Sequence, residues 1–298
     1  MSNAPHHFGC IEAGGTKFVL GILTGAGEIE ALHRIETTTP AETIGGALDW
    51  MSAQCDRVGG LAAIGIASFG PVSLDPDAPD FGHITATTKP GWSGTSFARV
   101  FADRFGVPIG FDTDVNGAAL AEYRWGASQG SSVSAYVTVG TGIGGGAIIQ
   151  GRPHKGLNHP EMGHIRPPRH RLDPSFEGVC SFHGDCLEGL ASGPAIKARW
   201  GQTLSDLPDG HPAHEIVAWY LAHMVVTLQA VMEPARIVLG GGVMATPGLL
   251  ARIRREADLL GGGFFRGRAS EIVVAPALGD KAGLLGGLAL AQDALASH

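Results

Sequence analysis

The chain has 298 residues, 44% of them hydrophobic, so it is long enough to bury the core of one large domain or of two lobes. Its formal net charge is -7 at pH 7 and it has no Lys/Arg-rich run, which argues against nucleic acid as a partner. Its first residues lack a basic start followed by an apolar stretch, and no uninterrupted apolar segment reaches the ~18 residues that span a membrane. We therefore expect a cytoplasmic protein with no membrane partner.

The number and placement of the glycines and cysteines narrow the class of protein further. The 46 glycines alternate with Val/Ile/Leu runs, which is typical of tight turns and of places where backbone meets a ligand. Four cysteines in a chain of this length do not indicate a disulfide-bonded secreted domain. Cys10 and Cys55, in an apolar run and a helical stretch, are interpreted as small buried hydrophobic residues.

Two glycine-rich hairpins are predicted. The segment "CIEAGGTKFVLGIL" turns at Gly14 and Gly15, and "AYVTVGTGIGGGAII", about 125 residues later, turns at Gly140, Thr141 and Gly142. Two similar hairpins indicate a duplicated α/β fold with a cleft between its halves. Such turns present backbone N–H groups and hydroxyls, which suit an anionic phosphate.

The first turn adds charged and hydroxyl groups in the pattern E-x-G-G-T-K. Thr16 offers a hydrogen bond to a phosphate oxygen and Lys17 a positive charge, while Glu12 precedes the glycines. Alone this signal is modest, because Gly-Gly hairpins are common. Neither turn fits the G-x-x-x-x-G-K-[ST] loop or a strand-to-helix dinucleotide fingerprint.

Helices and strands alternate between the hairpins. The patterns predict a helix, a strand, a proline-containing loop, a second helix and a strand, in that order, over residues 43–56, 61–67, 68–92, 96–105 and 108–111. In "DTDVNGAALAEYRWG", which follows, Asp112 and Asp114 offer N-cap oxygens to a further helix. Asp114 is equally well interpreted as a general base that accepts a hydroxyl proton in phosphoryl transfer.

The stretch 152–192 is irregular and rich in His, Pro and Gly, so it is either disordered or organised by something such as a metal. Cys180, His183 and Cys186 are spaced C-x-x-H-x-x-C, and His164 is the expected fourth ligand of a closed Cys2His2 zinc site. The competing candidates for the fourth ligand are His154, His159 and His170. Four protein ligands leave no position for water, so the zinc is expected to be structural.

The remaining elements complete a mixed α/β series. Residues 214–234 read as a buried helix, 236–240 and 271–277 as strands, and 282–296 as a closing helix. We expect an N-terminal lobe over residues 1–114, with the closing helix (about 282–298) packed back on it. A C-terminal lobe is expected over 115–281 and contains the zinc loop 152–192.

These motifs resemble those of the ROK-family sugar kinases. The matching segments are "IEAGGTK", "DTDVNGAALAE", "TVGTGIGGGAI", "HPEMGH", "CSFHGDCLEGLASGPAI" and "RIVLGGGV", and they extend over nearly the whole chain. The resemblance implies an actin-like (ribonuclease H-like) ATPase fold with two lobes and a central cleft. It also implies Mg2+ with ATP and transfer of the γ-phosphate to a hexose, most specifically D-fructose to fructose 6-phosphate.

The resemblance also implies residue roles. Asp114 is the expected base, and the expected sugar-binding residues are Thr113, Glu161, His164 and Glu188, with His164 also a zinc ligand. The expected ATP and phosphate contacts are Glu12, Gly14, Gly15, Thr16, Lys17, Gly140, Thr141, Gly142, Gly240, Gly241 and Gly242. We expect the zinc to act on sugar binding through the geometry of the loop, without touching the phosphate chemistry, and a homodimer is expected.

Several positions depart from the usual family pattern. Thr113 replaces an Asn, Glu12 replaces an Asp, and the usual Cys-rich cluster has become C-x-x-H-x-x-C; together with Lys89–Trp92 and Pro160 these changes resemble the zinc-containing fructokinase branch. The alternative activity is that of an N-acetylhexosamine or glucose kinase. A repressor of this family would need a helix-turn-helix domain before the first hairpin, and a non-catalytic sugar-binding regulator would be expected to lack Asp114.

Overall fold

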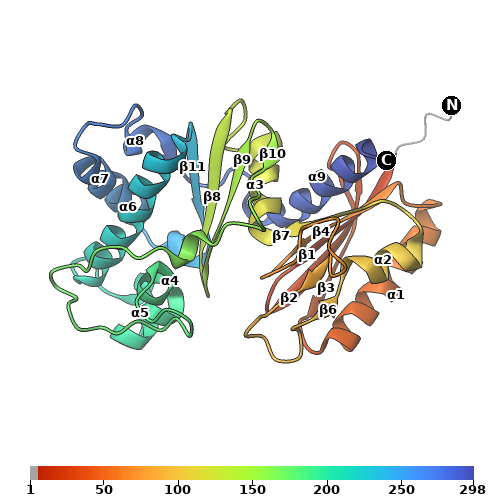
Figure 1. Cartoon of the computed structure of the whole chain (residues 1–298), viewed down its shortest axis with the longest axis horizontal. Coiled ribbons are helices and arrows are strands. Elements are labelled where there is room, and N and C mark those ends of the chain that lie inside the picture. The colour runs from red at the N-terminus through yellow and green to blue at the C-terminus, as the bar shows by residue number, and fades with distance from the viewer. Residues whose placement is uncertain (1–5) are drawn as a thin grey trace. The chain divides into compact units, whose positions relative to one another are not determined.

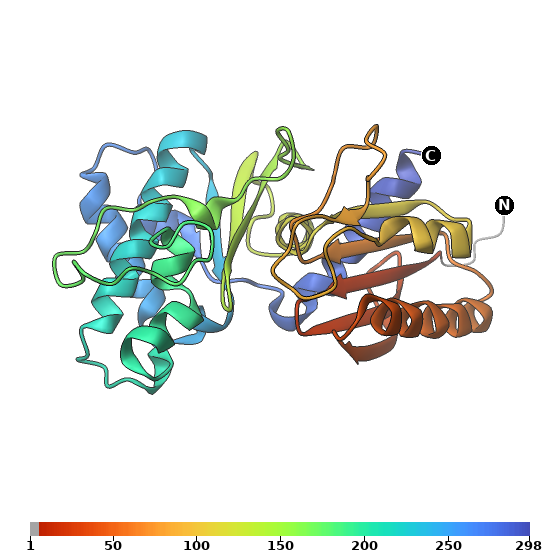
Figure 2. The ribbon, with the colours of Figure 1, turned by 60° about the horizontal axis from the view of Figure 1, so that its bottom comes forward.

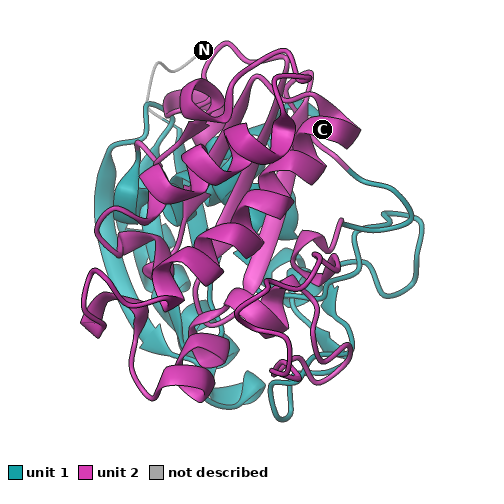
Figure 3. Cartoon of the chain, turned by 90° about the vertical axis from the view of Figure 1, so that its left-hand side faces the viewer, with its two compact units in different colours: residues 1–121, 155–159, 278–298 teal, residues 122–154, 160–277 magenta. Residues whose placement is uncertain are grey.

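The computed structural model describes residues 6–298, which form two compact units (Figure 3). Unit 1 comprises Met1–Ala121, Lys155–His159 and Leu278–His298, and unit 2 comprises Glu122–His154 and Pro160–Ala277. Residues 1–5 of the expected N-terminal lobe lie outside the described residues. The units divide within helix α3 (Asp114–Trp125), and the short return of residues 155–159 to unit 1 has no counterpart in the sequence-based expectation.

Unit 1 is built on a five-stranded sheet in the order β3-β2-β1-β4-β7. Its strands are β1 (His7–Ala13), β2 (Lys17–Thr24), β3 (Ile29–Glu36), β4 (Ala63–Ser68) and β7 (Ile109–Thr113). The predicted first hairpin is confirmed as antiparallel β1–β2, and β1, β4 and β7 are mutually parallel. The register aligns Ala13 with Ser68 and Ser68 with Thr113, so three strands end at one edge of the sheet.

Helices cover both faces of this sheet (Figure 1). On one face α1 (Pro40–Val58) and α2 (Ala98–Phe105) pack on a buried core of aliphatic and aromatic side chains. On the other face lies α9 (Ala282–Ala296), the predicted closing helix. A Cβ at Gly65 would overlap the Gly287 carbonyl oxygen, so the absence of a side chain there lets α9 lie directly on the strands. The predicted helices at 43–56 and 96–105 and strands at 61–67 and 108–111 correspond to α1, α2, β4 and β7.

The proline-containing loop after β4 carries a two-stranded ribbon, β5 (His83–Ile84) paired with β6 (Thr95–Ser96). Trp92 from this loop is fully buried and donates from its indole Nε1 to the Thr38 carbonyl at 2.9 Å. Its ring contacts Phe18 and Phe69, with centroids 5.7 and 5.2 Å apart. The loop is therefore held to unit 1 by an aromatic anchor.

Unit 2 contains the second five-stranded sheet, in the order β10-β9-β8-β11-β12. Its strands are β10 (Arg152–Pro153), β9 (Ile143–Ile149), β8 (Val133–Val139), β11 (Arg236–Gly240) and β12 (Val273–Val274). The second predicted hairpin is confirmed as antiparallel β8–β9, and β11 runs parallel to β8. Its helices are α4 (Leu187–Ala191), α5 (Gly193–Trp200), α6 (Ala213–Met232), α7 (Leu249–Gly261) and α8 (Ala269–Ile272), with short 3-10 turns η1 (Met162–His164), η2 (Leu204–Asp206) and η3 (Gly242–Ala245); η4 (Gly279–Lys281) precedes α9 in unit 1.

Helix α6 is the core helix of unit 2, as its apolar sequence predicts (Figure 2). Among the described residues it is the one helix long and apolar enough to cross a membrane, and 56% of its most apolar window is buried. A core helix of a folded protein meets the same criteria of length and composition.

The predicted strand over 271–277 is largely wrong. Only Val273 and Val274 pair with β11, and the residues before them form α8. The cause lies in α7, where the Asp258 carboxylate accepts hydrogen bonds from the Ala269 and Ser270 N–H groups at 2.6 and 3.4 Å. These bonds satisfy donors at the start of a helical turn, so the segment begins as helix despite its β-branched residues.

Candidate functional site

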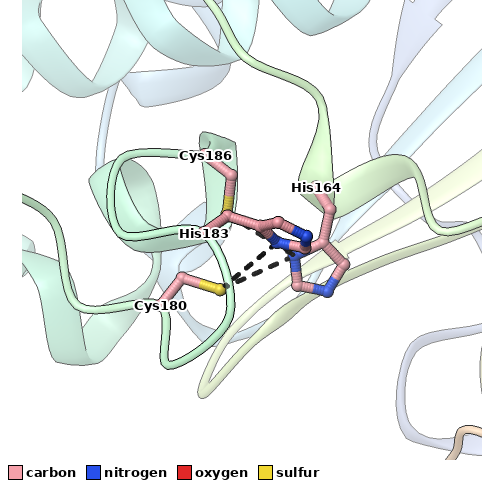
Figure 4. A group of neighbouring side chains, drawn as sticks. All are labelled: His164, Cys180, His183 and Cys186. Carbon is pink, nitrogen blue, oxygen red and sulfur yellow. Dashed lines mark hydrogen bonds between the residues drawn. The ribbon is translucent and has the colours of Figure 1, made fainter.

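Four potential metal ligands converge in unit 2, as the sequence predicts (Figure 4). The ligand atoms of His164, Cys180, His183 and Cys186 all lie within 4.8 Å of one another. The His164 Nδ1 atom is 3.5 Å from Cys186 Sγ and 3.8 Å from Cys180 Sγ. The His183 Nδ1 atom is 3.2 Å from His164 Nδ1 and 3.7 Å from Cys180 Sγ.

These four separations, of 3.2 to 3.8 Å, lie close to the edges of a tetrahedron around zinc. Bond lengths of about 2.3 Å to sulfur and about 2.05 Å to nitrogen give ligand-to-ligand edges of about 3.3 to 3.8 Å. The donor set, two thiols and two imidazoles, is also the one that zinc prefers. Burial raises the pKa of the Cys186 thiol to about 11, and a bound metal would supply the charge that stabilises a thiolate in this buried position.

The three alternative histidines lie elsewhere. His159 accepts a hydrogen bond from the Val72 N–H in unit 1, and the His170 ring packs edge-on against Trp219 at 5.5 Å. Across residues 6–298, neither of them nor His154 joins the group around Cys180. The spacing-based choice of His164 therefore agrees with the geometry of the described chain.

His164 presents its two ring nitrogens to different partners. Nδ1 faces the cysteines, whereas Nε2 lies 4.0 Å from Glu161 Oε2. A carboxylate on the outer nitrogen of a metal-binding histidine orients the ring and fixes which nitrogen binds the metal. The structure therefore places Glu161 beside the metal group, as its position three residues before His164 suggested.

The rest of the irregular stretch is held by a second polar cluster, which the sequence reasoning missed. The Asp173 carboxylate accepts hydrogen bonds from Arg199 Nη1 at 2.6 Å and from the Tyr220 hydroxyl at 2.7 Å. Arg169 Nη2 donates to the Asp173 carbonyl at 2.8 Å, and the Arg199 guanidinium lies 4.2 Å from the Phe176 ring centroid. These contacts fix the conformation of the loop against α5 and α6, in addition to any order that a bound metal would supply.

The β8–β9 turn lies close to the segments that bear the metal ligands. Glu188 Oε2 accepts a hydrogen bond of 2.9 Å from the Ile143 N–H, and the Gly193 N–H donates to the Gly140 carbonyl at 2.8 Å. Thr141, at the tip of the turn, is exposed. The turn therefore presents its backbone and a hydroxyl to solvent, while α4 and α5 hold its base.

Gly240, Gly241 and Gly242, at the carboxyl end of β11, lie at the same edge of the sheet as the β8–β9 turn. Gly241 has a φ of +94°, and a Cβ there would lie 2.5 Å from both the nitrogen and the oxygen of Val139. Only glycine fits a position with this backbone angle and this clearance. Gly242 N is the nearest atom to a Cβ built at Gly140, at 3.9 Å, so the two glycine turns of unit 2 are neighbours.

The β1–β2 turn of unit 1 is closed by its own backbone. Gly14 N–H donates to the Lys17 carbonyl at 3.0 Å, and the Thr37 hydroxyl donates to the Gly14 carbonyl at 2.8 Å, while Gly15 and Thr16 are exposed. Burial raises the pKa of Glu12, and the positive charge of Lys17 opposes this shift. The Glu12 carboxylate packs directly against the backbone of Gly283, where a Cβ atom would overlap it.

The first residues of α3 show which side chain caps the helix, a role that the sequence left open for Asp112 and Asp114. The Thr113 hydroxyl accepts from the Asn116 N–H at 3.1 Å and so caps the helix, whereas Asp114 Oδ1 accepts from the adjacent Val115 N–H at 2.9 Å. Asp112 is buried and accepts from the Thr113 N–H and from Asn116 Nδ2 at 2.8 and 2.7 Å. The N-cap of α3 is therefore Thr113, and Asp114 is the first residue of the helix.

The segment 155–159 adds polar contacts that sequence reasoning also missed. Lys155 Nζ lies 3.3 Å from Asp112 Oδ2. Asn158 accepts from the Leu74 N–H at 3.2 Å and donates to the Val72 carbonyl at 2.6 Å, in the manner of a neighbouring strand. The pairing of distant residues by side-chain-to-backbone bonds leaves no periodic signal in the sequence.

A profile of the ROK family matches residues 8–294. The chain is 50% identical over 298 residues to a fructokinase of Zymomonas mobilis, covering 99% of each chain, and 39% identical over 288 residues to a fructokinase of Pediococcus pentosaceus, covering 96% and 98%. The solved structure of a ROK-family glucokinase from Streptomyces griseus, in complex with glucose and AMPPNP, superposes with a TM-score of 0.73 at 28% identity and covers 96% and 99% of the two chains.

Proposed function

The chain belongs to the ROK family, and we propose that it is an ATP-dependent fructokinase that phosphorylates the 6-hydroxyl of D-fructose. The observation that carries this proposal is the 50% identity to a fructokinase over 99% of both chains. The actin-like α/β fold of the family accords with the two five-stranded sheets, each with a glycine-turned hairpin.

We assign the general base to Asp114. Its carboxylate accepts the proton of the fructose 6-hydroxyl as that oxygen forms a bond to the γ-phosphorus of ATP. The bond from the γ-phosphorus to the β–γ bridging oxygen breaks, and ADP leaves with that oxygen. The position of Asp114, directly after the carboxyl end of β7, supports this role because α/β proteins bind ligands at that edge of the sheet.

The proposed sugar-binding residues are Thr113, Glu161, His164 and Glu188. Carboxylates bind vicinal hydroxyls well because each oxygen accepts a hydrogen bond. Glu161 and Glu188 are supported as a pair by their attachment to the metal group, three residues before His164 and two after Cys186. We assign Glu188 Oε1 to the sugar, since Oε2 already accepts from the Ile143 N–H.

The proposed phosphate contacts are the two hairpin turns and the glycines at the carboxyl end of β11. These residues are Glu12, Gly14, Gly15, Thr16, Lys17, Gly140, Thr141, Gly142, Gly240, Gly241 and Gly242. The exposure of Gly15, Thr16, Lys17 and Thr141 supports their availability to a ligand. Mg2+ is expected to arrive with ATP and to neutralise part of its phosphate charge.

Zinc is proposed as a structural ion held by His164, Cys180, His183 and Cys186. The fit of the ligand separations to a tetrahedron supports this assignment. When bound, the ion would supply conformational order, because four protein ligands leave no position for a reacting oxygen. We place the reaction in the cytoplasm, where ATP is supplied, and we expect a homodimer, which light scattering on the purified protein tests.

A coupled ADP-release assay on a panel of free hexoses, with and without Mg2+, tests the function. We expect the largest kcat/KM for fructose, formation of fructose 6-phosphate and no turnover without Mg2+. A kcat/KM for glucose equal to or above that for fructose would refute the assignment. Such a result would favour the second candidate, a glucose kinase, for which the 28% identity to the Streptomyces griseus glucokinase is the supporting observation.

A further inference from the structure

The backbone of Ile143, at the base of the β8–β9 turn, is contacted at both its N–H and its carbonyl group. On its nitrogen side the Glu188 carboxylate accepts the N–H at 2.9 Å. The same carboxylate oxygen would lie 2.7 Å from a Cβ at Gly142, so it also occupies the space beside the turn. Glu188 is thus packed into the turn that we assign to phosphate.

The 3-10 turn η1 packs against the carbonyl group of the same residue. A Cβ at Gly163 would overlap the Ile143 carbonyl oxygen, which means that the backbone of η1 lies directly on β9. The neighbouring Met162 side chain packs against Gly145, where a Cβ would lie 2.6 Å from the methionine sulfur. Contacts this close transmit any movement of η1 to the strand.

Both segments that hold Ile143 also carry metal ligands. His164 directly follows Gly163, and Cys186 precedes Glu188 by two residues. The Leu187 N–H donates to the Ile165 carbonyl at 2.8 Å, which ties the two segments to each other. The metal group and the turn that we assign to phosphate are therefore joined by a short path of contacts that includes the partly buried Glu188.

We propose that Glu188 is a positioning residue for the Gly140–Gly142 turn, and that through it the metal group controls nucleotide binding as well as sugar binding. The nucleotide part of this statement rests on the proposed function. It revises the sequence-based expectation that the metal acts on the sugar alone. Loss of the metal loosens η1 and the start of α4, and the turn then has to be ordered by ATP itself, which weakens apparent affinity.

Two variants at position 188 test the role by hydrogen–deuterium exchange of the 138–147 peptide and by calorimetric affinities for ATP and fructose. Glu188→Gln retains an oxygen that accepts from Ile143 N–H, whereas Glu188→Ala removes it. Loss of one hydrogen bond to a charged acceptor weakens an equilibrium by about tenfold or more. We expect Glu188→Ala to raise the ATP Kd and the exchange rate of this peptide by about tenfold, and Glu188→Gln to change each by less than about threefold.

Chelated wild-type protein should resemble Glu188→Ala at this peptide and in ATP Kd. Asp185→Asn is the matched control, because Asp185 lies in the same loop but pairs with Arg166 at 3.1 Å instead of with the turn. It should leave both quantities at wild-type values. Zinc content measured on each variant confirms that Glu188→Ala still carries the metal.

If Glu188→Ala raises only the fructose Kd and leaves the exchange of peptide 138–147 unchanged, Glu188 serves the sugar alone and the proposal is wrong. An unchanged ATP Kd after complete removal of the metal overturns it as well. Should the wild-type protein bind no ATP at all, the proposed function fails, but the exchange measurement still decides whether Glu188 and the metal hold the turn.

Discussion

Asp112 and Lys155 form an ion pair in which Nζ lies 3.3 Å from Oδ2, with the Asp112 side chain 2% exposed and that of Lys155 39% exposed. The acid directly precedes Thr113 and the proposed base Asp114. Burial of a carboxylate is tolerated when a cation and hydrogen bonds compensate its charge. Asp112 has both, because its other oxygen accepts from the Thr113 N–H and from Asn116 Nδ2.

Removal of the cation should therefore destabilise unit 1. We expect Lys155→Met, which keeps the apolar stem, to cost about 1 to 2 kcal/mol, less than for a fully buried pair because the lysine is partly exposed. Thermal and urea unfolding measure the change. The double variant with Asp112→Asn should recover part of the loss, since a neutral amide does not need the cation. Identical stability of Lys155→Met and the wild type would mean that the pair is not a stabilising contact.

The start of α3 gives a prediction that separates catalysis from capping. Asp114→Asn should lower kcat by about 100- to 10,000-fold, the usual contribution of a positioned base. Its unfolding temperature should stay close to that of the wild type, because the Thr113 hydroxyl caps the helix. Thr113→Ala should instead lose about 1 kcal/mol of stability. Thr113→Ser keeps the hydroxyl and serves as its control.

A loss of turnover smaller than about tenfold in Asp114→Asn would contradict the assignment of the base. If Asp114→Asn unfolded as readily as Thr113→Ala, Asp114 would be a structural residue. Its lower kcat would then not support a role as the general base. Calorimetric measurement of fructose binding to Asp114→Asn adds a further check, since the variant should still bind the sugar.

The geometry of the metal group predicts that alanine substitutions of two histidines in one loop differ in their effect on zinc content. His183→Ala removes one of four ligands, and purified protein should then carry well below one zinc per chain. His170→Ala should retain the metal, because its ring packs on Trp219 away from the group. Elemental analysis of protein purified without chelators gives the answer. Zinc retained in His183→Ala, or absent from the wild type, would contradict the assigned ligand set.

The sequence predicted those features whose partners lie close together along the chain. The two hairpins, the cap region at Asp112–Asp114 and the group formed by Cys180, His183 and Cys186 are all local patterns of glycine, small polar residues or potential metal ligands. The convergence of His164 on this group was also predicted, because a four-coordinate site needs one more donor and few candidates lie nearby.

Features that depend on distant partners were missed. The hydrogen bond from the Ile143 N–H to Glu188, the contact between Lys155 and Asp112, and the caps that Asp258 supplies to α8 join residues far apart in sequence. Each uses a common charged residue whose default interpretation is a solvated surface group. Such residues acquire a structural role only once the fold brings a partner to them.

The cluster around Asp173 is the clearest example and leads to a prediction on alkaline pH. The Tyr220 hydroxyl donates to Asp173 Oδ2 at 2.7 Å and accepts from the His170 N–H at 3.3 Å, and Tyr220 has no exposed surface. Burial, with a contribution from the bond to Asp173, raises the pKa of Tyr220 to about 12 from an ordinary value of 10.0. The folded protein therefore holds the phenol proton at a pH where the unfolded chain has released it.

The sign of the effect follows from proton linkage. Between about pH 10 and pH 12 the unfolded state binds fewer protons at this group than the folded state, so stability falls as pH rises. Below about pH 10 both states are protonated and the contribution of Tyr220 is fully present. Tyr220→Phe removes the titration and keeps the ring, at a cost of about 1 kcal/mol near neutral pH for the lost hydrogen bond.

We therefore expect the wild type to lose its stability advantage over Tyr220→Phe as pH rises from 10 to 12. Urea unfolding of both proteins at matched ionic strength measures this difference, and the comparison cancels the titration of lysines that both proteins share. Parallel stability curves over this range would mean that Tyr220 titrates as it does in the unfolded chain. The cluster would then contribute packing to the loop at Asp173, without the buried hydrogen bond that the structure assigns to it.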